Sequence, residues 1–144
     1  MSFIIRNCRI EDAEALQKLN REDLGYDYPV EELRERLETV LGSEKDRIWV
    51  AVMGQQVVGY IHACGYDVIY APHMKDIMGI AVSSACRRVG IGRALRYAVE
   101  EWGREDGAAG IRLVSGTDRA DAHAFYRSCG YNGGKTQLNF KKYL

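Results

Sequence analysis

A glycine-containing segment between an apolar run and an amphipathic run most constrains the fold of this chain. The apolar run covers residues 77–82 (Ile-Met-Gly-Ile-Ala-Val), and the segment covers residues 87–92 (Arg-Arg-Val-Gly-Ile-Gly). Leu95, Val99 and Trp102 then recur at helical spacing. The sequence therefore predicts a buried strand, a loop and a helix in that order.

This loop and the first turn of the helix are predicted to bind an anion. Glycines let the backbone direct several N–H groups towards one point, and a helix N-terminus adds unpaired N–H donors and partial positive charge. Arg87, Arg88 and Arg93 add full charges. Pyrophosphate is a natural occupant of such a site.

Two common phosphate loops do not fit the sequence. The dinucleotide-binding pattern requires Gly or Ala where this chain has Leu95. The P-loop pattern would end at residues 134–136 (Gly-Lys-Thr), but its first glycine would fall on Cys129.

A third pattern fits, and a second motif supports it. Arg87-x-x-Gly90-x-Gly92 resembles the acetyl-CoA loop of the GCN5-related N-acetyltransferases (GNAT), which reads Gln/Arg-x-x-Gly-x-Gly/Ala. Residues 122–131 (Ala-His-Ala-Phe-Tyr-Arg-Ser-Cys-Gly-Tyr) resemble the C-terminal signature of the same family, Ala-x-x-Phe-Tyr-x-x-x-Gly-[Phe/Tyr]. The Ala-His-x-Phe-Tyr form is common in the bacterial small-molecule branch of the family.

Length and composition fit one globular domain covering residues 1–144. The chain has 144 residues, of which 47% are hydrophobic and 28% charged, and its formal net charge is zero. Zero net charge argues against general nucleic-acid binding. No apolar stretch is long enough to span a bilayer, and no signal peptide is recognised, so we expect no membrane association and a cytoplasmic protein.

Cysteine and histidine spacing predicts no metal site. The four cysteines are widely separated and form no Cys-x-x-Cys motif, and the three histidines have no zinc-site spacing. We expect four reduced thiols.

The predicted elements alternate in an α/β order. Strands are expected at residues 3–5, 48–52, 57–61, 76–82, 111–115 and 137–143, and helices at 11–19, 29–41, 91–106 and 119–128. This order is similar to that of the GNAT family over nearly the whole chain. The resemblance implies a mixed, mostly antiparallel sheet flanked by four helices, with strands 76–82 and 111–115 splayed apart.

The resemblance also implies the activity. Acetyl-CoA would donate an acetyl group to a primary amine of a small molecule, with CoA as product. The alternatives are acetylation of protein N-termini or lysines, and a non-catalytic acetyl-CoA-binding module. Dimerisation is common in the family, so a homodimer is an expectation.

Site residues follow from the matched motifs. Tyr126 matches the tyrosine that protonates the leaving thiolate, although a helix-packing role would also suit it. A phenol pKa of about 10 is close to that of a thiol, about 8.5. The residues expected to contact the cofactor are Ile80, Ala81, Val82, Arg87, Arg88, Val89, Gly90, Ile91, Gly92, Arg93, Ala94 and His123.

The general base is less defined by the sequence. Asp76, Met78 and Ile80 are expected to share one face of their strand, where many family members carry an acidic residue. Asp76 is therefore the candidate base, and a solvated strand start is the alternative interpretation. His62, Tyr66 and His73 are other candidates.

The acceptor amine is expected over the loop between the first two helices. Tyr26 and Tyr28 are predicted to form a wall there, and Glu22, Asp23 and Asp27 to attract a cationic amine. A solvated acidic helix face would have the same composition.

Overall fold

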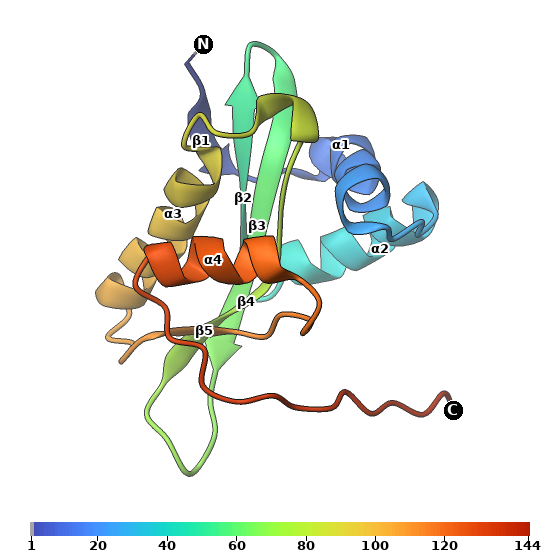
Figure 1. Cartoon of the computed structure of the whole chain (residues 1–144). Helices are drawn as coiled ribbons and strands as arrows, with labels where there is room; N and C mark the ends of the chain where they lie inside the picture. Colours follow the sequence, from blue (N-terminus) through green and yellow to red (C-terminus); the bar gives the residue numbers. More distant parts are fainter. Residues whose placement is uncertain (1) are drawn as a thin grey trace. The chain divides into compact units, whose positions relative to one another are not determined.

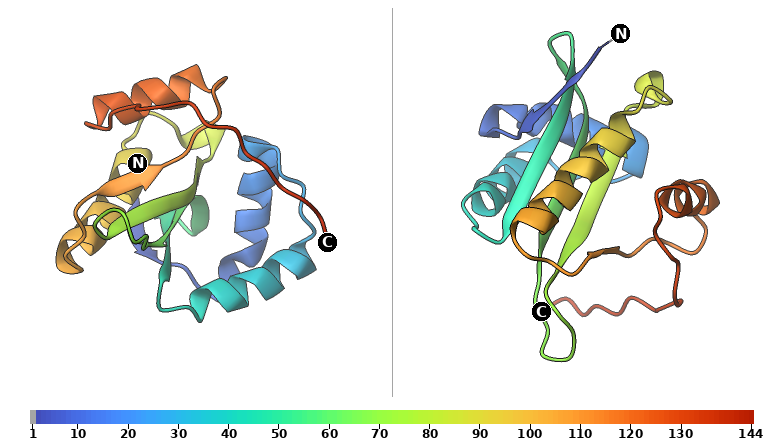
Figure 2. Two further views of the ribbon diagram at one scale, coloured as in Figure 1. Left: turned by 90° about the horizontal axis from the view of Figure 1, so that it is seen from below. Right: turned by 90° about the vertical axis from the view of Figure 1, so that its left-hand side faces the viewer.

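The computed structural model describes residues 2–144, which fall into two compact units. The first unit runs to Leu113 and contains the sheet and three helices, and the second runs from Val114 to Leu144 and contains one helix (Figures 1 and 2). Each unit is described separately below. The expectation of one domain over residues 1–144 stays a prediction.

The first unit is built on a five-stranded sheet in which chain order and spatial order agree. The strands are β1 (Ile4–Asn7), β2 (Asp46–Met53), β3 (Gln56–Tyr66), β4 (Met74–Val82) and β5 (Ile111–Leu113). Strands β1 to β4 pair antiparallel, and β5 pairs parallel with β4. The prediction of a mixed, mostly antiparallel sheet is therefore confirmed.

Four helices accompany the sheet in the chain. They are α1 (Ala13–Leu19), α2 (Val30–Leu41), α3 (Ile91–Glu105) and α4 (Ala120–Ser128). Short turns of 3₁₀-helix cover Ile10–Asp12 and Ser84–Cys86, and a π-helical turn, Asn20–Leu24, extends α1. Pro29 occupies the N-cap position of α2 and Gly42 the C-cap position, so the helix begins one residue after the predicted start.

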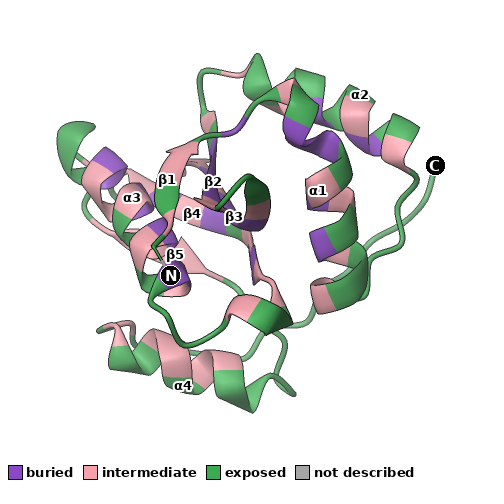
Figure 3. Ribbon diagram, turned by 90° about the horizontal axis from the view of Figure 1, so that it is seen from above, coloured by how far each residue is buried: buried purple, intermediate pink, exposed green. Residues whose placement is uncertain are grey.

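Two apolar cores cover the two faces of the sheet. Helices α1 and α2 pack on one face and α3 on the other (Figures 1 and 3). The alternation along β2 divides its side chains accordingly: Ile48 and Val50 face α1 and α2, and Trp49 and Ala51 face α3.

Helix α3 approaches β3 closely at Gly59. A Cβ atom built there would lie 3.1 Å from the carbonyl oxygen of Ala81 and 3.2 Å from the Ile91 side chain. A side chain at this position would push α3 away from the sheet. Gly59 therefore fixes how near the first turn of α3 lies to β3 and β4.

The prediction of a last strand at residues 137–143 is wrong. Residues 137–143 alternate as a strand would, yet the second unit contains no strand after Leu113 among the described residues. Leu138 and Phe140 are 78% and 86% exposed. Alternation orients side chains, but a strand also needs a neighbouring backbone to receive its hydrogen bonds, and this segment has none. The strand predicted at 111–115 ends at Leu113.

No helix within residues 2–144 has the length and the apolar composition needed to cross a membrane.

Candidate active site

The central feature of the first unit is the point where β4 separates from β5. The two strands pair only over Lys75–Ile77 and Ile111–Leu113. From Met78 to Val82, β4 is paired with β3 alone. Alternate residues of this stretch therefore direct backbone N–H and C=O groups to an edge without a strand partner in the first unit.

A β-bulge lies where the separation begins. Ile77 pairs with Ala63 and Gly79 with His62, which leaves Met78 as an extra residue in β4. Ile77 and Ile80 both pack in the core against α3. The bulge has therefore shifted the alternation of side chains by one residue.

The bulge corrects one expectation from the sequence. Asp76 and Ile80 were predicted to share a face, but Ile80 packs towards α3 with Ile77, and Asp76, the neighbour of Ile77, faces the α1 and α2 side. A strict period of two holds only in a strand without a bulge. Met78 is 57% exposed at the bulge.

The loop after β4 leads directly into α3 and has an unusual backbone. Gly90 has φ +91° and Arg88 has φ +67°, so both lie in the left-handed region. The first helical hydrogen bond runs from the Ala94 N–H to the Gly90 carbonyl, at 3.0 Å. The first N–H groups of an α-helix have no acceptor one turn earlier within the helix, and here these begin with Ile91 and Gly92.

These residues fit a pyrophosphate group. A Cβ atom built on Gly90 would meet nothing within 4 Å, so the space before the first turn of α3 is open. Arg87, Arg88 and Val89 are exposed beside it. Open space, the N–H donors of a helix start and cationic side chains together suit a CoA pyrophosphate.

Arg87 has a partner that sequence reasoning missed. Its guanidinium Nη2 lies 3.4 Å from Oδ1 of Asp23, and the same oxygen accepts a hydrogen bond from the Ser84 N–H at 3.1 Å. The Asp23 side chain is only 6% exposed. Asp23 therefore faces the loop after β4, and the expectation that it attracts the amine stays a prediction.

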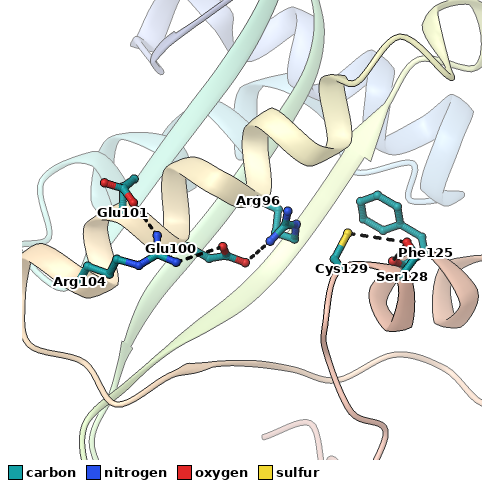
Figure 4. Close-up of polar contacts among 7 residues, drawn as sticks. All are labelled: Arg96, Glu100, Glu101, Arg104, Phe125, Ser128 and Cys129. Atoms are coloured by element: carbon teal, nitrogen blue, oxygen red, sulfur yellow. Dashed lines mark hydrogen bonds and ion pairs between the residues drawn. The ribbon is translucent and has the colours of Figure 1, made fainter.

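The remaining arginines of α3 differ in their surroundings. Arg96 pairs with Glu100, and Arg104 lies 3.8 Å from Glu100 and 2.5 Å from Glu101 (Figure 4). Such i,i+3 and i,i+4 pairs stabilise the helix. Arg93 is exposed in the first turn, near the open space before Gly90.

Asp76 lies beside a cation on the neighbouring strand. Its Oδ2 is 3.0 Å from Nη1 of Arg112, the residue paired with it in β5. Burial raises the pKa of the Asp76 carboxyl, and the Arg112 charge acts in the opposite direction. The Asp76 side chain is 16% exposed, so a substrate amine could reach it. The same geometry also suits a structural ion pair with Arg112.

The other candidate bases have structural partners. His62 Nε2 lies 2.7 Å from Asp46, and the Tyr66 ring lies under the Arg112 guanidinium at 4.2 Å. His73 Nδ1 lies 2.8 Å from Asp67, and His73 Nε2 lies 3.2 Å from Asp106. Of the three histidine and tyrosine candidates, only Tyr66 touches the partner of Asp76.

The loop between α1 and α2 is exposed. Tyr26 and Tyr28 are 65% and 44% exposed, and Asp27 between them is exposed as well. The preceding turn is attached to the sheet, because the Tyr60 hydroxyl donates to Oδ1 of Asn20 at 2.5 Å. Nothing in the local sequence signals this contact, since the two residues are 40 positions apart.

The second unit contains Tyr126 and His123 on α4. The Tyr126 ring lies 5.4 Å from the Phe125 ring and 6.0 Å from the Tyr131 ring, between centroids. Burial raises the pKa of the Tyr126 hydroxyl, which keeps it protonated near neutral pH. His123 is half-buried on the same helix.

The end of α4 is closed by local bonds. The Ser128 hydroxyl donates to the Phe125 carbonyl at 2.6 Å and lies 3.9 Å from the Cys129 sulfur (Figure 4). Gly130 follows with φ +90°, the left-handed conformation that commonly ends a helix. Across the described chain, no three His, Cys, Asp or Glu side chains are grouped to hold a metal ion.

Comparison with known proteins identifies the family. Residues 13–131 match the acetyltransferase (GNAT) family. Human N-acetyltransferase 8 is 32% identical over 96 residues, which cover 64% of this chain and 40% of that protein. The chain thus spans about two fifths of the length of this curated relative.

Solved structures share the fold over the whole chain. A complex of the aminoglycoside acetyltransferase AAC(6')-Iy with a CoA bisubstrate analogue has a TM-score of 0.87 at 17% identity, covering 100% of both chains. AAC(6')-Ih from Acinetobacter baumannii has a TM-score of 0.85 at 18% identity, covering 99% of both chains. A transcriptional regulator from Bacillus halodurans has a TM-score of 0.88 at 24% identity, covering 98% of this chain and 100% of that chain.

The family match covers most of the sequence and includes both motifs, the loop before α3 and the helix α4. The chain therefore belongs to the GNAT family of acetyltransferases.

Proposed function

We propose that the chain transfers the acetyl group of acetyl-CoA to a primary amine of a small molecule. The observation that carries this proposal is the free edge of β4 from Met78 to Val82. It offers backbone donors and acceptors along a line that leads to the loop before α3. An extended amide-containing arm can pair with such an edge as a strand would.

The cofactor would be held at two places in the first unit. The backbone of Ile80, Ala81 and Val82 would bind the pantetheine arm. The N–H groups at the start of α3 would bind the pyrophosphate, with help from Arg87, Arg88 and Arg93. When bound, acetyl-CoA supplies an activated thioester carbonyl.

Asp76 is proposed as the general base. An ammonium ion has no free electron pair, so the acceptor must lose a proton before it can attack. Asp76 lies three residues before Gly79, and its carboxyl is partly buried beside Arg112. Burial makes it a stronger proton acceptor than an exposed aspartate.

Tyr126 is proposed as the general acid, and His123 as a further cofactor contact. The raised pKa of the Tyr126 hydroxyl keeps the proton on the oxygen until it is needed. A neutral phenol can donate a proton to a departing thiolate. Burial widens the difference between the pKa of Tyr126 and that of a thiol, about 8.5, so the transfer costs more than it would from a free phenol.

The acceptor would enter beside Tyr26, Asp27 and Tyr28. The choice of an amine acceptor is supported by structural neighbours that are aminoglycoside acetyltransferases. The direct experiment is an acetyl-transfer assay over small primary amines, aminoglycosides, and peptides with free N-termini or lysines. We expect turnover with small amines at a kcat/KM at least tenfold above that for any peptide. Equal or faster acetylation of peptides would contradict the small-molecule assignment.

The loop before α3 can be tested with Gly90→Asp. The change places a negative charge in the open space before α3, where we expect pyrophosphate. CoA affinity measured by calorimetry should fall at least tenfold, or about 1.4 kcal/mol. Gly107→Asp is the matched control, because Gly107 also has positive φ and open space but lies at the opposite end of α3. Equal CoA affinity in both variants and the parent would rule out the loop as the site.

The base assignment predicts a pH signature. Asp76→Asn should lower turnover about 10²-fold or more while CoA still binds. In the parent, kcat/KM should fall as pH drops through the pKa of Asp76, because the base must be ionised. Arg112 lowers that pKa, so Arg112→Gln should move the acid limb to higher pH. An acid limb that stays in place in Arg112→Gln, or near-parent turnover in Asp76→Asn, would assign the pair to structure.

The acid assignment is tested by Tyr126→Phe. The change keeps the ring contacts with Phe125 and Tyr131 and removes the proton donor. Turnover should fall about 10²–10⁴-fold while melting temperature and CoA affinity hold. The loss should be smaller with an acyl donor whose thiol is more acidic. Tyr131→Phe, which removes a hydroxyl from the same aromatic group, serves as the control. Full activity in Tyr126→Phe would refute the assignment.

A further inference from the structure

A cavity of about 140 Å³ lies in the first unit where α1 and α2 face the sheet. Most of its wall is aliphatic and comes from Leu16, Leu33, Leu37, Val40 and Ile48. The cavity is open to solvent, so an enclosed apolar cavity of about 150 Å³ that binds benzene in another protein indicates only the size of group that has room here. The volume and the lining therefore suit one benzene-sized ring or one branched alkyl group.

Three of the four polar residues that line this cavity already have a hydrogen-bond partner: Asn20, Tyr60 and His62. The Tyr60 hydroxyl donates to Asn20, and His62 Nε2 lies 2.7 Å from Asp46. Burial raises the pKa of Tyr60 to about 12, so its hydroxyl stays neutral. A strongly hydrated group entering the cavity would find few free partners, whereas an apolar group would lose none.

Arg36 is the only arginine or lysine among the residues that line the cavity. Its side chain is exposed on α2, and no carboxylate of the described residues lies within ion-pair distance of it. A ligand with a second ammonium group would be repelled there. Arg36 thus opposes a second ammonium group at its own position on the rim, while the glutamates of α2 lie outside the lining.

The cavity adjoins the part of β4 that would hold the thioester. The Tyr60 hydroxyl lies 3.5 Å from the point where a Cβ atom on Gly79 would stand. Gly79 is the first residue after the bulge and lies on the stretch of β4 that β5 does not pair. A molecule whose apolar end fills the cavity can therefore extend its other end towards this stretch.

Building on the proposed function, we propose that this cavity receives the apolar group of the acceptor. The acceptor is then a primary amine joined by a short linker to one aryl or branched alkyl group. This class differs from the polyamine antibiotics named for the structural neighbours.

Acceptor kinetics test the class directly. Phenethylamine and isopentylamine should have kcat/KM values at least tenfold above that of ethanolamine, which has the amine and no apolar group. They should also exceed the value for neamine, which carries several ammonium groups. Equal kcat/KM values for phenethylamine and ethanolamine would overturn the proposal.

A ligand that cannot be acetylated on nitrogen tests the cavity separately. 2-Phenylethanol has the ring and linker without the amine, and its binding can be followed by NMR titration. Val40→Phe adds a ring at the cavity wall and should weaken this binding at least tenfold. Leu41→Phe is the matched control, since Leu41 is the next residue, is 37% exposed and does not line the cavity. Thermal melting of both variants checks that they remain folded.

The two measurements separate the failure of the cavity from the failure of the proposed function. If amines are acetylated but 2-phenylethanol binds the parent and Val40→Phe equally, the cavity assignment is overturned and the function stands. If 2-phenylethanol binding follows the predicted pattern but no amine is acetylated, the function is overturned, and the cavity is no acceptor site.

Discussion

Backbone hydrogen bonding along β4 is the constraint on which the arrangement of the first unit depends. A strand in the interior of a sheet needs partners on both sides, and β4 has a second partner only up to Ile77. The bulge at Met78 turns the chain at that point. The stretch to Val82 is consequently left with hydrogen-bonding capacity that a ligand can use. A binding site of this kind needs no dedicated side chain.

Helix α3 must lie in a fixed position for its N-terminus to serve as an anion site. At one end Gly59 allows the first turn to approach β3. At the other end Lys75, only 2% exposed, pairs with Asp106 and places its ammonium 3.8 Å from the Trp102 ring centroid. A buried cation without these partners would be costly, so the contact strongly favours one position of the helix end. The helix is thus held at both ends, which keeps the loop before it in place.

The sequence predicted most of the elements because their signals are local. Helical and alternating periodicity located five strands and four helices, and the two glycine-containing motifs located the anion loop and α4. The bulge at Met78 was missed because one extra residue leaves an apolar run looking continuous, and the face of Ile80 was assigned wrongly as a result. The Tyr60 contact with Asn20 and the Asp23 contact with Ser84 join residues 40 and 61 positions apart. No local pattern encodes contacts of that kind.

The π-helical turn Asn20–Leu24 determines where Asp23 lies, and this has a consequence for changes in chain length. A π-turn accommodates one residue more than an α-helical turn of the same rise. Deleting one residue here would restore regular helix and rotate Asp23 by about 100° away from Ser84 and Arg87. A shortening of this turn, which precedes the proposed acceptor loop, would then alter the loop after β4, where we propose that the cofactor binds. Relatives that differ in the length of this turn are thus expected to differ in how they hold the segment after β4, even where its own sequence is the same.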